Sequence, residues 1–158
     1  MTNYLASALE YHAAGLRVIP FTKKDPGGVQ FPKWQHWQER EQTEGEVRAL
    51  FAHDSDGIAM LCTDGIEAID IDVKHDTTGR IPYLFFGGVK LYASGDEALN
   101  QCVIQKTKSA GWHVIYKTNT HEGNQKLAHL QGSKEAVIET RGKGGLLFVW
   151  PTPGYELK

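Results

Sequence analysis

The chain has 158 residues, which suits a single domain with a hydrophobic core of its own. Hydrophobic residues make up 41% of it and charged residues 23%, which is ordinary for a soluble globular protein. The formal net charge of -2 gives no general indication of nucleic-acid binding, so a binding site depends on local charge. No apolar run approaches the roughly 20 residues of a membrane-spanning helix, and the first residues show no secretory signal. We therefore expect a cytoplasmic protein without a membrane partner.

The two cysteines, Cys62 and Cys102, both lie in apolar stretches that are typical of strands. Neither has a second cysteine or a histidine at metal-ligand spacing, which argues against a structural zinc site. We expect both to be buried free thiols, in keeping with a cytoplasmic setting.

The chain begins with a predicted helix. Thr2 is placed to cap it, Leu5, Leu9 and Ala13 repeat at helical spacing, and Gly15 is placed to end it. A second helix is indicated further on by the sequence at 43–46, which has the form of a capping box, with an apolar stripe after it.

Short apolar runs predict several strands. They cover residues 16–21, 58–62, 66–73, 103–107, 113–117, 137–140 and 146–150. Turn residues between them predict that the second and third, the fourth and fifth, and the last two form hairpins. The stretch 74–100 supports no assignment, and 119–131 is polar enough to predict a loop or short helix. The fold class is therefore α+β, in one domain over residues 1–158.

Asp70 and Asp72 are the most informative residues in the chain. In the sequence from Ile69 to Val73 they alternate with apolar residues, so on a strand both carboxylates point to one face. Two carboxylates on one face repel each other unless a cation lies between them, and hard oxygen ligands suit Mg²⁺ or Mn²⁺. An edge strand with two solvated aspartates is the alternative.

Glu139 is a third acidic residue on a predicted strand. Three carboxylates of this kind can hold two metal ions for phosphoryl transfer. Without the two aspartates, an ion pair with Arg141 or a lysine is the simpler interpretation.

His113 begins a predicted strand after Ser109, Gly111 and a basic residue, Lys108. Together with Arg141, these side chains could bind a triphosphate by donating to its oxygens. A serine hydrolase is disfavoured, because no Gly-x-Ser-x-Gly motif is present.

With these motifs in order, the chain resembles the bifunctional primase-polymerase domains of the archaeo-eukaryotic primase superfamily. The similarity extends from about Leu5 to Tyr155. The matching motifs are Ile69-Asp70-Ile71-Asp72, Ser109-Ala110-Gly111-Trp112-His113 and Ile138-Glu139-Thr140-Arg141. Each motif is weak alone, whereas their shared order and spacing are specific.

The resemblance implies an RRM-like antiparallel catalytic sheet with helices and an N-terminal α/β unit. It implies template-directed synthesis on single-stranded DNA from nucleoside triphosphates (NTP or dNTP), with Mg²⁺ or Mn²⁺. Asp70, Asp72 and Glu139 would hold the metals, and His113 would be catalytic and contact the triphosphate. Ser109, Lys108 and Arg141 would complete the nucleotide site, and Lys24 and Lys33 are further candidates for phosphate or template contacts.

The resemblance also implies a phage, plasmid or mobile-element replication system and a longer replication protein with a helicase region or partner. This sequence departs from the family at Trp112, whose bulk we expect to affect access to the base or template, and at Glu139, where an aspartate is common. Two alternative functions stay open: an inactive nucleic-acid-binding module on the same fold, and a metal-dependent nuclease.

Overall fold

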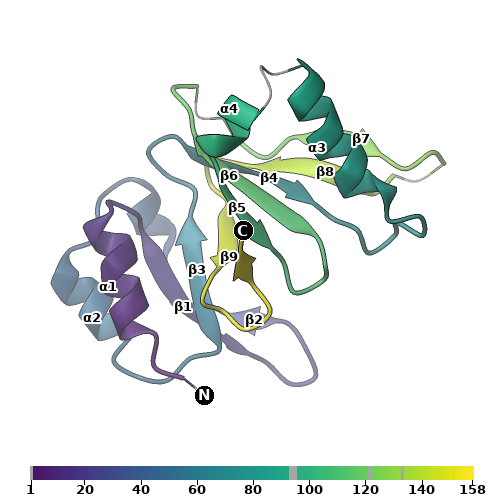
Figure 1. The fold of residues 1–158 in the computed structure, drawn as a ribbon. Coiled ribbons are helices and arrows are strands. Elements are labelled where there is room, and N and C mark those ends of the chain that lie inside the picture. The colour runs from purple at the N-terminus through teal and green to yellow at the C-terminus, as the bar shows by residue number, and fades with distance from the viewer. Residues whose placement is uncertain (1, 93–95, 121, 133) are drawn as a thin grey trace.

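The computed structural model describes residues 2–92, 96–120, 122–132 and 134–158. It confirms a mixed α+β chain in which the strands form two antiparallel sheets (Figure 1). The RRM-like character of the catalytic sheet stays a prediction.

The first sheet has four strands in the order β2-β1-β3-β9. Its strands are β1 (Val18–Lys23), β2 (Val29–Gln30), β3 (Gly57–Leu61) and β9 (Leu146–Val149). Helices α1 (Leu5–Ala13) and α2 (Glu44–Leu50) lie together on one side of it, and a short 3-10 helix covers Gln35–Gln38 (Figure 1). Every residue of β3 is buried, as expected for a central strand covered on both faces.

The second sheet has six strands in the order β10-β5-β6-β4-β8-β7. These are β4 (Ile66–Ile71), β5 (Val103–Lys106), β6 (Trp112–Lys117), β7 (Lys126–His129), β8 (Ala136–Arg141) and β10 (Glu156–Leu157). Helices α3 (Arg80–Tyr92) and α4 (Asp96–Asn100) lie over this sheet on the side away from α1 and α2 (Figure 1).

Of the two predicted helix caps, one is confirmed and the other is wrong. The capping box is confirmed, because the Thr43 side chain accepts from the Glu46 backbone N–H and the Glu46 carboxylate accepts from the Thr43 N–H. The prediction that Thr2 caps the first helix is wrong. Asn3 accepts from the Leu5 N–H instead, while Thr2 forms an isolated bridge with Ser55.

Of the three predicted hairpins, only β5–β6 is a paired hairpin. The turn between β3 and β4 exists, with positive φ at Asp64 and Gly65, but the two strands belong to different sheets. The same is true of β8 and β9. Each of the strands β3 and β4 already has a partner on both edges, β1 and β9 for one and β6 and β8 for the other. Local turn signals therefore predict where the chain reverses direction, but not which strands pair with each other.

Two stretches contain helices or a strand that the sequence does not predict. The unassigned stretch 74–100 contains α3 and α4 after a loop at 74–79, and its residues 93–95 lie outside the described residues. The stretch 119–131, predicted as a loop or short helix, contains strand β7 instead, and its residue 121 also lies outside the described residues. Cys62 is buried and free as predicted, whereas Cys102 is free but only partly buried.

The main hydrophobic core joins the two sheets beneath α1 and α2. It contains Phe51 and Val47 of the α2 region, Met60 of β3, Leu147 of β9 and Ala68 of β4. Ala68 shares a strand face with Asp70, so the acidic face of β4 begins in the core and continues toward an open cavity. Within the described part of the chain, no helix is long and apolar enough to cross a membrane.

Thr152 fixes the segment after β9 to β3. Its side chain is 4% exposed, accepts from the Ile58 N–H at 2.8 Å and donates to the Ile58 carbonyl at 3.2 Å.

Thr152→Val removes both hydrogen bonds at nearly constant volume and leaves buried backbone groups unpaired. We expect it to lower the free energy of unfolding by about 1–3 kcal/mol in urea denaturation. Thr77→Val, at an exposed threonine, is the control, and equal effects of the two changes would contradict this role.

Candidate active site

Asp70 lies at the centre of the six-stranded sheet. In the antiparallel register it is paired with His113 of β6 on one side and Glu139 of β8 on the other. Cross-strand partners point to the same face and neighbouring strands lie about 4.8 Å apart. Three residues that are far apart in the sequence are therefore side by side.

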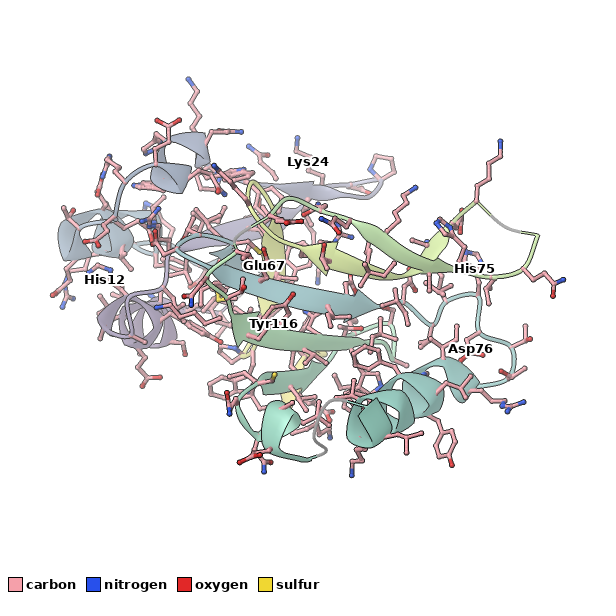
Figure 2. The ribbon with its side chains drawn as sticks, turned by 90° about the horizontal axis from the view of Figure 1, so that it is seen from above. His12, Lys24, Glu67, His75, Asp76 and Tyr116 are labelled. Atoms are coloured by element: carbon pink, nitrogen blue, oxygen red, sulfur yellow. The ribbon has the colours of Figure 1, made fainter. Side chains whose placement is uncertain are left out.

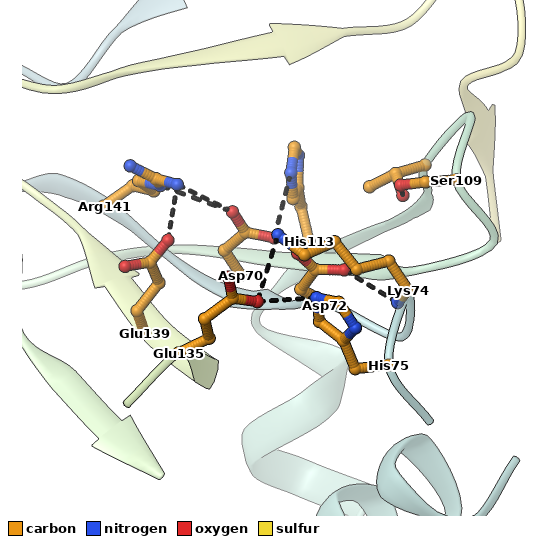
Figure 3. Close-up of polar contacts among 10 residues, drawn as sticks. Asp70, Asp72, Lys74, His75, Ser109, His113, Glu135, Glu139 and Arg141 are labelled. Carbon is orange, nitrogen blue, oxygen red and sulfur yellow. Dashed lines mark hydrogen bonds and ion pairs between the residues drawn. The ribbon is translucent and has the colours of Figure 1, made fainter. Parts of the chain in front are cut away.

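Arg141 bridges two carboxylates of this site. Its guanidinium lies 3.3 Å from Oδ2 of Asp70 and 2.5 Å from Oε1 of Glu139 (Figure 3). The Asp70 side chain is 19% exposed. Burial raises its pKa, Arg141 opposes that shift, and the nearby charge of Asp72 adds to it. Arg141 thus supplies the positive charge that a pair of neighbouring carboxylates requires.

Asp72 lies just beyond the end of β4, at the rim of the site. Its backbone N–H still donates to the carbonyl of Val137, so the ladder with β8 continues by one bond. Its carboxylate accepts from the Lys74 N–H at 2.9 Å and lies 3.4 Å from Lys74 Nζ. Glu135 contacts both His75, at 2.6 Å, and Lys74, at 3.8 Å (Figure 3). A mixed network of charges thus surrounds Asp72.

His113 is buried, with 6% of its surface exposed. Burial, and secondarily the charge of Arg141, lowers its pKa to about 4, so the ring is neutral at pH 7. Nε2 lies 3.6 Å from Oδ1 of Asp70, which is too long for a hydrogen bond. Nδ1 lies 2.8 Å from the side-chain nitrogen of Gln105. The contact with Asp70 is therefore that of a neutral ring beside a carboxylate.

A cavity of about 310 Å³ opens over Asp70, Asp72, His113 and Arg141, whereas Glu139 is not part of its lining. Its polar lining comes from the six-stranded sheet and its turns, and its apolar lining comes mainly from β9. The lining residues are Asp70, Ile71, Asp72, Thr107, Ser109, His113, Arg141, Leu146, Leu147, Phe148 and Tyr155. The site thus lies between the two sheets.

The predicted basic residues are not all at this cavity. Lys108 lies in a neighbouring cavity with Lys23, and Tyr155 and Phe148 belong to the walls of both. Lys24, which lies on the turn between β1 and β2 (Figure 2), and Lys33 are exposed and line neither cavity.

The expectation that Trp112 affects access to the base or template is not supported. Its ring packs edge-on against Phe86 of α3, with ring centroids 5.5 Å apart. Alternation along β6 places this ring on the opposite face from His113. Trp112 therefore helps to attach α3 to the back of the sheet.

Sequence reasoning missed two residues of the site, Gln105 and Tyr155. Gln105 is 1% exposed and contacts His113, and Tyr155 lies with its ring centroid 6.0 Å from that of His113. Burial raises the pKa of Tyr155, with a further contribution from the charge of Asp70. A glutamine inside an apolar strand was the available signal, because a buried amide requires hydrogen-bond partners.

The donor atoms of the site suit a hard divalent cation, since carboxylate oxygens are the ligands that Mg²⁺ and Mn²⁺ prefer. The side chains are not assembled for one. Among the described residues, no group of three or more His, Cys, Asp and Glu side chains is placed to hold a metal ion. Arg141 lies on Asp70 and Glu139, and Lys74 lies on Asp72. The residues thus fit a metal in kind, and these two cations now occupy their oxygens.

Residues 8–156, nearly the whole chain, match the family described as bifunctional DNA primase/polymerase, N-terminal. The chain belongs to this family. No curated protein matches the sequence. The family implies a primase/polymerase type of nucleotidyltransferase, with a DNA template and nucleotides as substrates.

Arg141 offers a test of the charge balance in this primase/polymerase domain. Without divalent cations, Arg141→Gln leaves Asp70 and Glu139 to repel each other. We expect this change to lower the free energy of unfolding by about 1–2 kcal/mol, between the values typical of exposed and buried pairs.

Addition of Mn²⁺ should restore more stability to Arg141→Gln than it adds to the wild type, because a bound cation takes over the role of the guanidinium. Thermal denaturation with and without Mn²⁺ measures both effects. Arg48→Gln, which removes an exposed ion pair of α2, is the matched control. If Mn²⁺ stabilised Arg141→Gln no more than Arg48→Gln, this would contradict the idea that a bound cation replaces the Arg141 guanidinium.

Proposed function

We propose that this domain is a template-directed nucleotidyltransferase that joins nucleotides on single-stranded DNA, as a primase, a polymerase or both. The observation that carries the proposal is the register of three adjacent strands. It brings Asp70, His113 and Glu139 side by side, with Arg141 paired to both carboxylates. Asp70, Asp72, His113 and Arg141 line the cavity, and Glu139 is joined to it through Arg141. Acidic and basic groups at one place are what a metal-dependent reaction on a triphosphate requires.

Asp70, Asp72 and Glu139 are the proposed ligands of Mg²⁺ or Mn²⁺. When bound, these ions activate the attacking hydroxyl group and neutralise the charge of the departing pyrophosphate. The position of Asp70 on a central strand makes it the most rigidly held of the three. Asp72 and Glu139, on the rim and on the adjacent strand, can approach it from two sides.

Arg141 is proposed to exchange partners when substrate binds. In the structure it neutralises Asp70 and Glu139. Once cations bind these carboxylates, the guanidinium is released and can donate to phosphate oxygens, for which its planar arrangement of N–H groups is well suited. The same side chain thus stabilises the empty site and binds the substrate.

The remaining groups bind and orient the triphosphate. His113 donates from Nε2 and Ser109 from its hydroxyl, while Lys108 contributes charge from the neighbouring cavity. The 3′-hydroxyl group of a primer or initiating nucleotide attacks the α-phosphorus of the incoming nucleoside triphosphate. The new oxygen–phosphorus bond forms as the bond to pyrophosphate breaks, the hydroxyl proton passes to water, and pyrophosphate leaves. At about 310 Å³ the cavity is at the lower end for small-molecule sites, so it suits a triphosphate better than a whole nucleotide.

Several finer expectations remain predictions. They are the RRM-like arrangement of the sheet, the phage, plasmid or mobile-element origin, a helicase partner, the choice between Mg²⁺ and Mn²⁺, and a cytoplasmic location. The proposed chemistry does not depend on any of them.

The test is incorporation of labelled nucleoside triphosphates on a single-stranded DNA template, with Mg²⁺ or Mn²⁺, with and without an annealed primer. We expect template-dependent products from the wild type. Asp70→Asn and Asp72→Asn should each lower the rate about a hundredfold or more, because they remove charges that act on the transition state. Glu10→Gln, on the exposed side of α1, is the matched control and should keep the wild-type rate.

The products distinguish the functions. A ladder without a primer shows a primase, and extension of primers alone shows a polymerase. Degraded template from the wild type but not from Asp70→Asn would replace the proposal with a nuclease. Intact template that is bound but never copied would indicate an inactive binding module.

A further inference from the structure

Gln105 is a buried amide whose hydrogen-bonding groups all have partners. It is paired in register with His113 on the neighbouring strand and is 1% exposed. Its side-chain nitrogen lies 2.8 Å from the Phe148 carbonyl and 2.8 Å from Nδ1 of His113. Its side-chain oxygen accepts from the Trp150 N–H at 3.2 Å. The amide thus connects β5 of one sheet to the end of β9 in the other.

These partners fix the orientation of the amide. Rotating it by 180° would set its oxygen against the Phe148 carbonyl, which only accepts, and its nitrogen against the Trp150 N–H, which only donates. Both contacts would then be repulsive in a buried place where water cannot replace them. The nitrogen of Gln105 therefore faces His113.

The orientation of the amide determines the tautomer of the imidazole. One N–H of Gln105 donates to Phe148 and the other points at Nδ1 of His113, so Nδ1 has to accept. A neutral imidazole that accepts at Nδ1 carries its proton on Nε2. Nε2 lies 3.6 Å from Oδ1 of Asp70, and both residues line the cavity.

We propose that Gln105 is a positioning residue that holds His113 as the Nε2–H tautomer, so that His113 presents a hydrogen-bond donor to the cavity. The consequence for substrate rests on the proposed function: the donor is directed at an oxygen of the triphosphate. With the opposite tautomer, Nε2 would present a lone pair to the phosphate and repel it. Gln105 takes no part in the reaction, but it determines that His113 donates a hydrogen bond to the cavity and does not accept one.

The tautomer is tested directly by ¹⁵N NMR of the histidine side chains in the wild-type protein. The spectrum of His113→Asn identifies the His113 signals by their loss. We expect a protonated Nε2 and an unprotonated Nδ1, together with a coupling across the hydrogen bond between Nδ1 and the Gln105 side-chain nitrogen. A protonated Nδ1 in the wild type overturns the proposal whether or not the protein copies DNA.

Gln105→Met tests the consequence, because methionine has nearly the same length and volume but cannot donate. We expect the Nδ1–H tautomer to become populated and the KM for the nucleoside triphosphate to rise about tenfold, with kcat per folded molecule little changed. Gln101→Met, at an exposed glutamine shortly before β5, is the control and should leave both unchanged. A merely structural role would lower thermal stability and the amount of active enzyme but leave KM and the tautomer as they were, and this result would overturn the proposal.

A double-mutant comparison keeps the test valid if Gln105→Met is less stable. In the His113→Asn background, Gln105→Met should have no further effect on KM, because the residue through which it acts is gone. Additive effects on KM would show that Gln105 does not act through His113. If the wild type incorporates no nucleotide, the proposed function fails, whereas the NMR result still decides the role of Gln105.

Discussion

The burial of one charged side chain governs this structure. Asp70 sits on the central strand of the six-stranded sheet, on a face that begins in the hydrophobic core at Ala68. A buried carboxylate is costly unless it is neutralised. Arg141, on the adjacent strand, supplies the compensating charge and is shared with Glu139. A guanidinium thus neutralises the buried Asp70, and in the proposed function a metal ion takes its place when substrate binds.

The site depends on both sheets, although its charged residues come from one. The carboxylates and His113 belong to the six-stranded sheet, whereas Phe148 and the segment that ends in Tyr155 close the cavity from the other side. The side chains of Gln105 and Thr152 hold that second wall in place by hydrogen bonds to backbone groups of Phe148, Trp150 and Ile58. The relative position of the sheets therefore determines both the shape of the cavity and the tautomer of His113.

The sequence predicted which residues gather at the site better than it predicted how the strands pair. Alternation around Asp70 and Asp72, and the order of the motifs, are local or family properties, and they indicated residues that the fold brings together. Strand pairing is not local. The turns at Asp64-Gly65 and at 142–145 carried hairpin signals, yet their strands pair elsewhere, because partners on both edges decide the register. Gln105 was missed since its role exists only through three partners that the fold supplies.

The most direct test of the account is a crystal structure with Mn²⁺ and a non-hydrolysable nucleoside triphosphate, in which anomalous scattering locates the metal. We predict anomalous peaks at Asp70, Asp72 and Glu139, with Arg141 turned from the carboxylates to the phosphates. A triphosphate bound elsewhere, with no metal at these carboxylates and Arg141 still on Asp70 and Glu139, would contradict it.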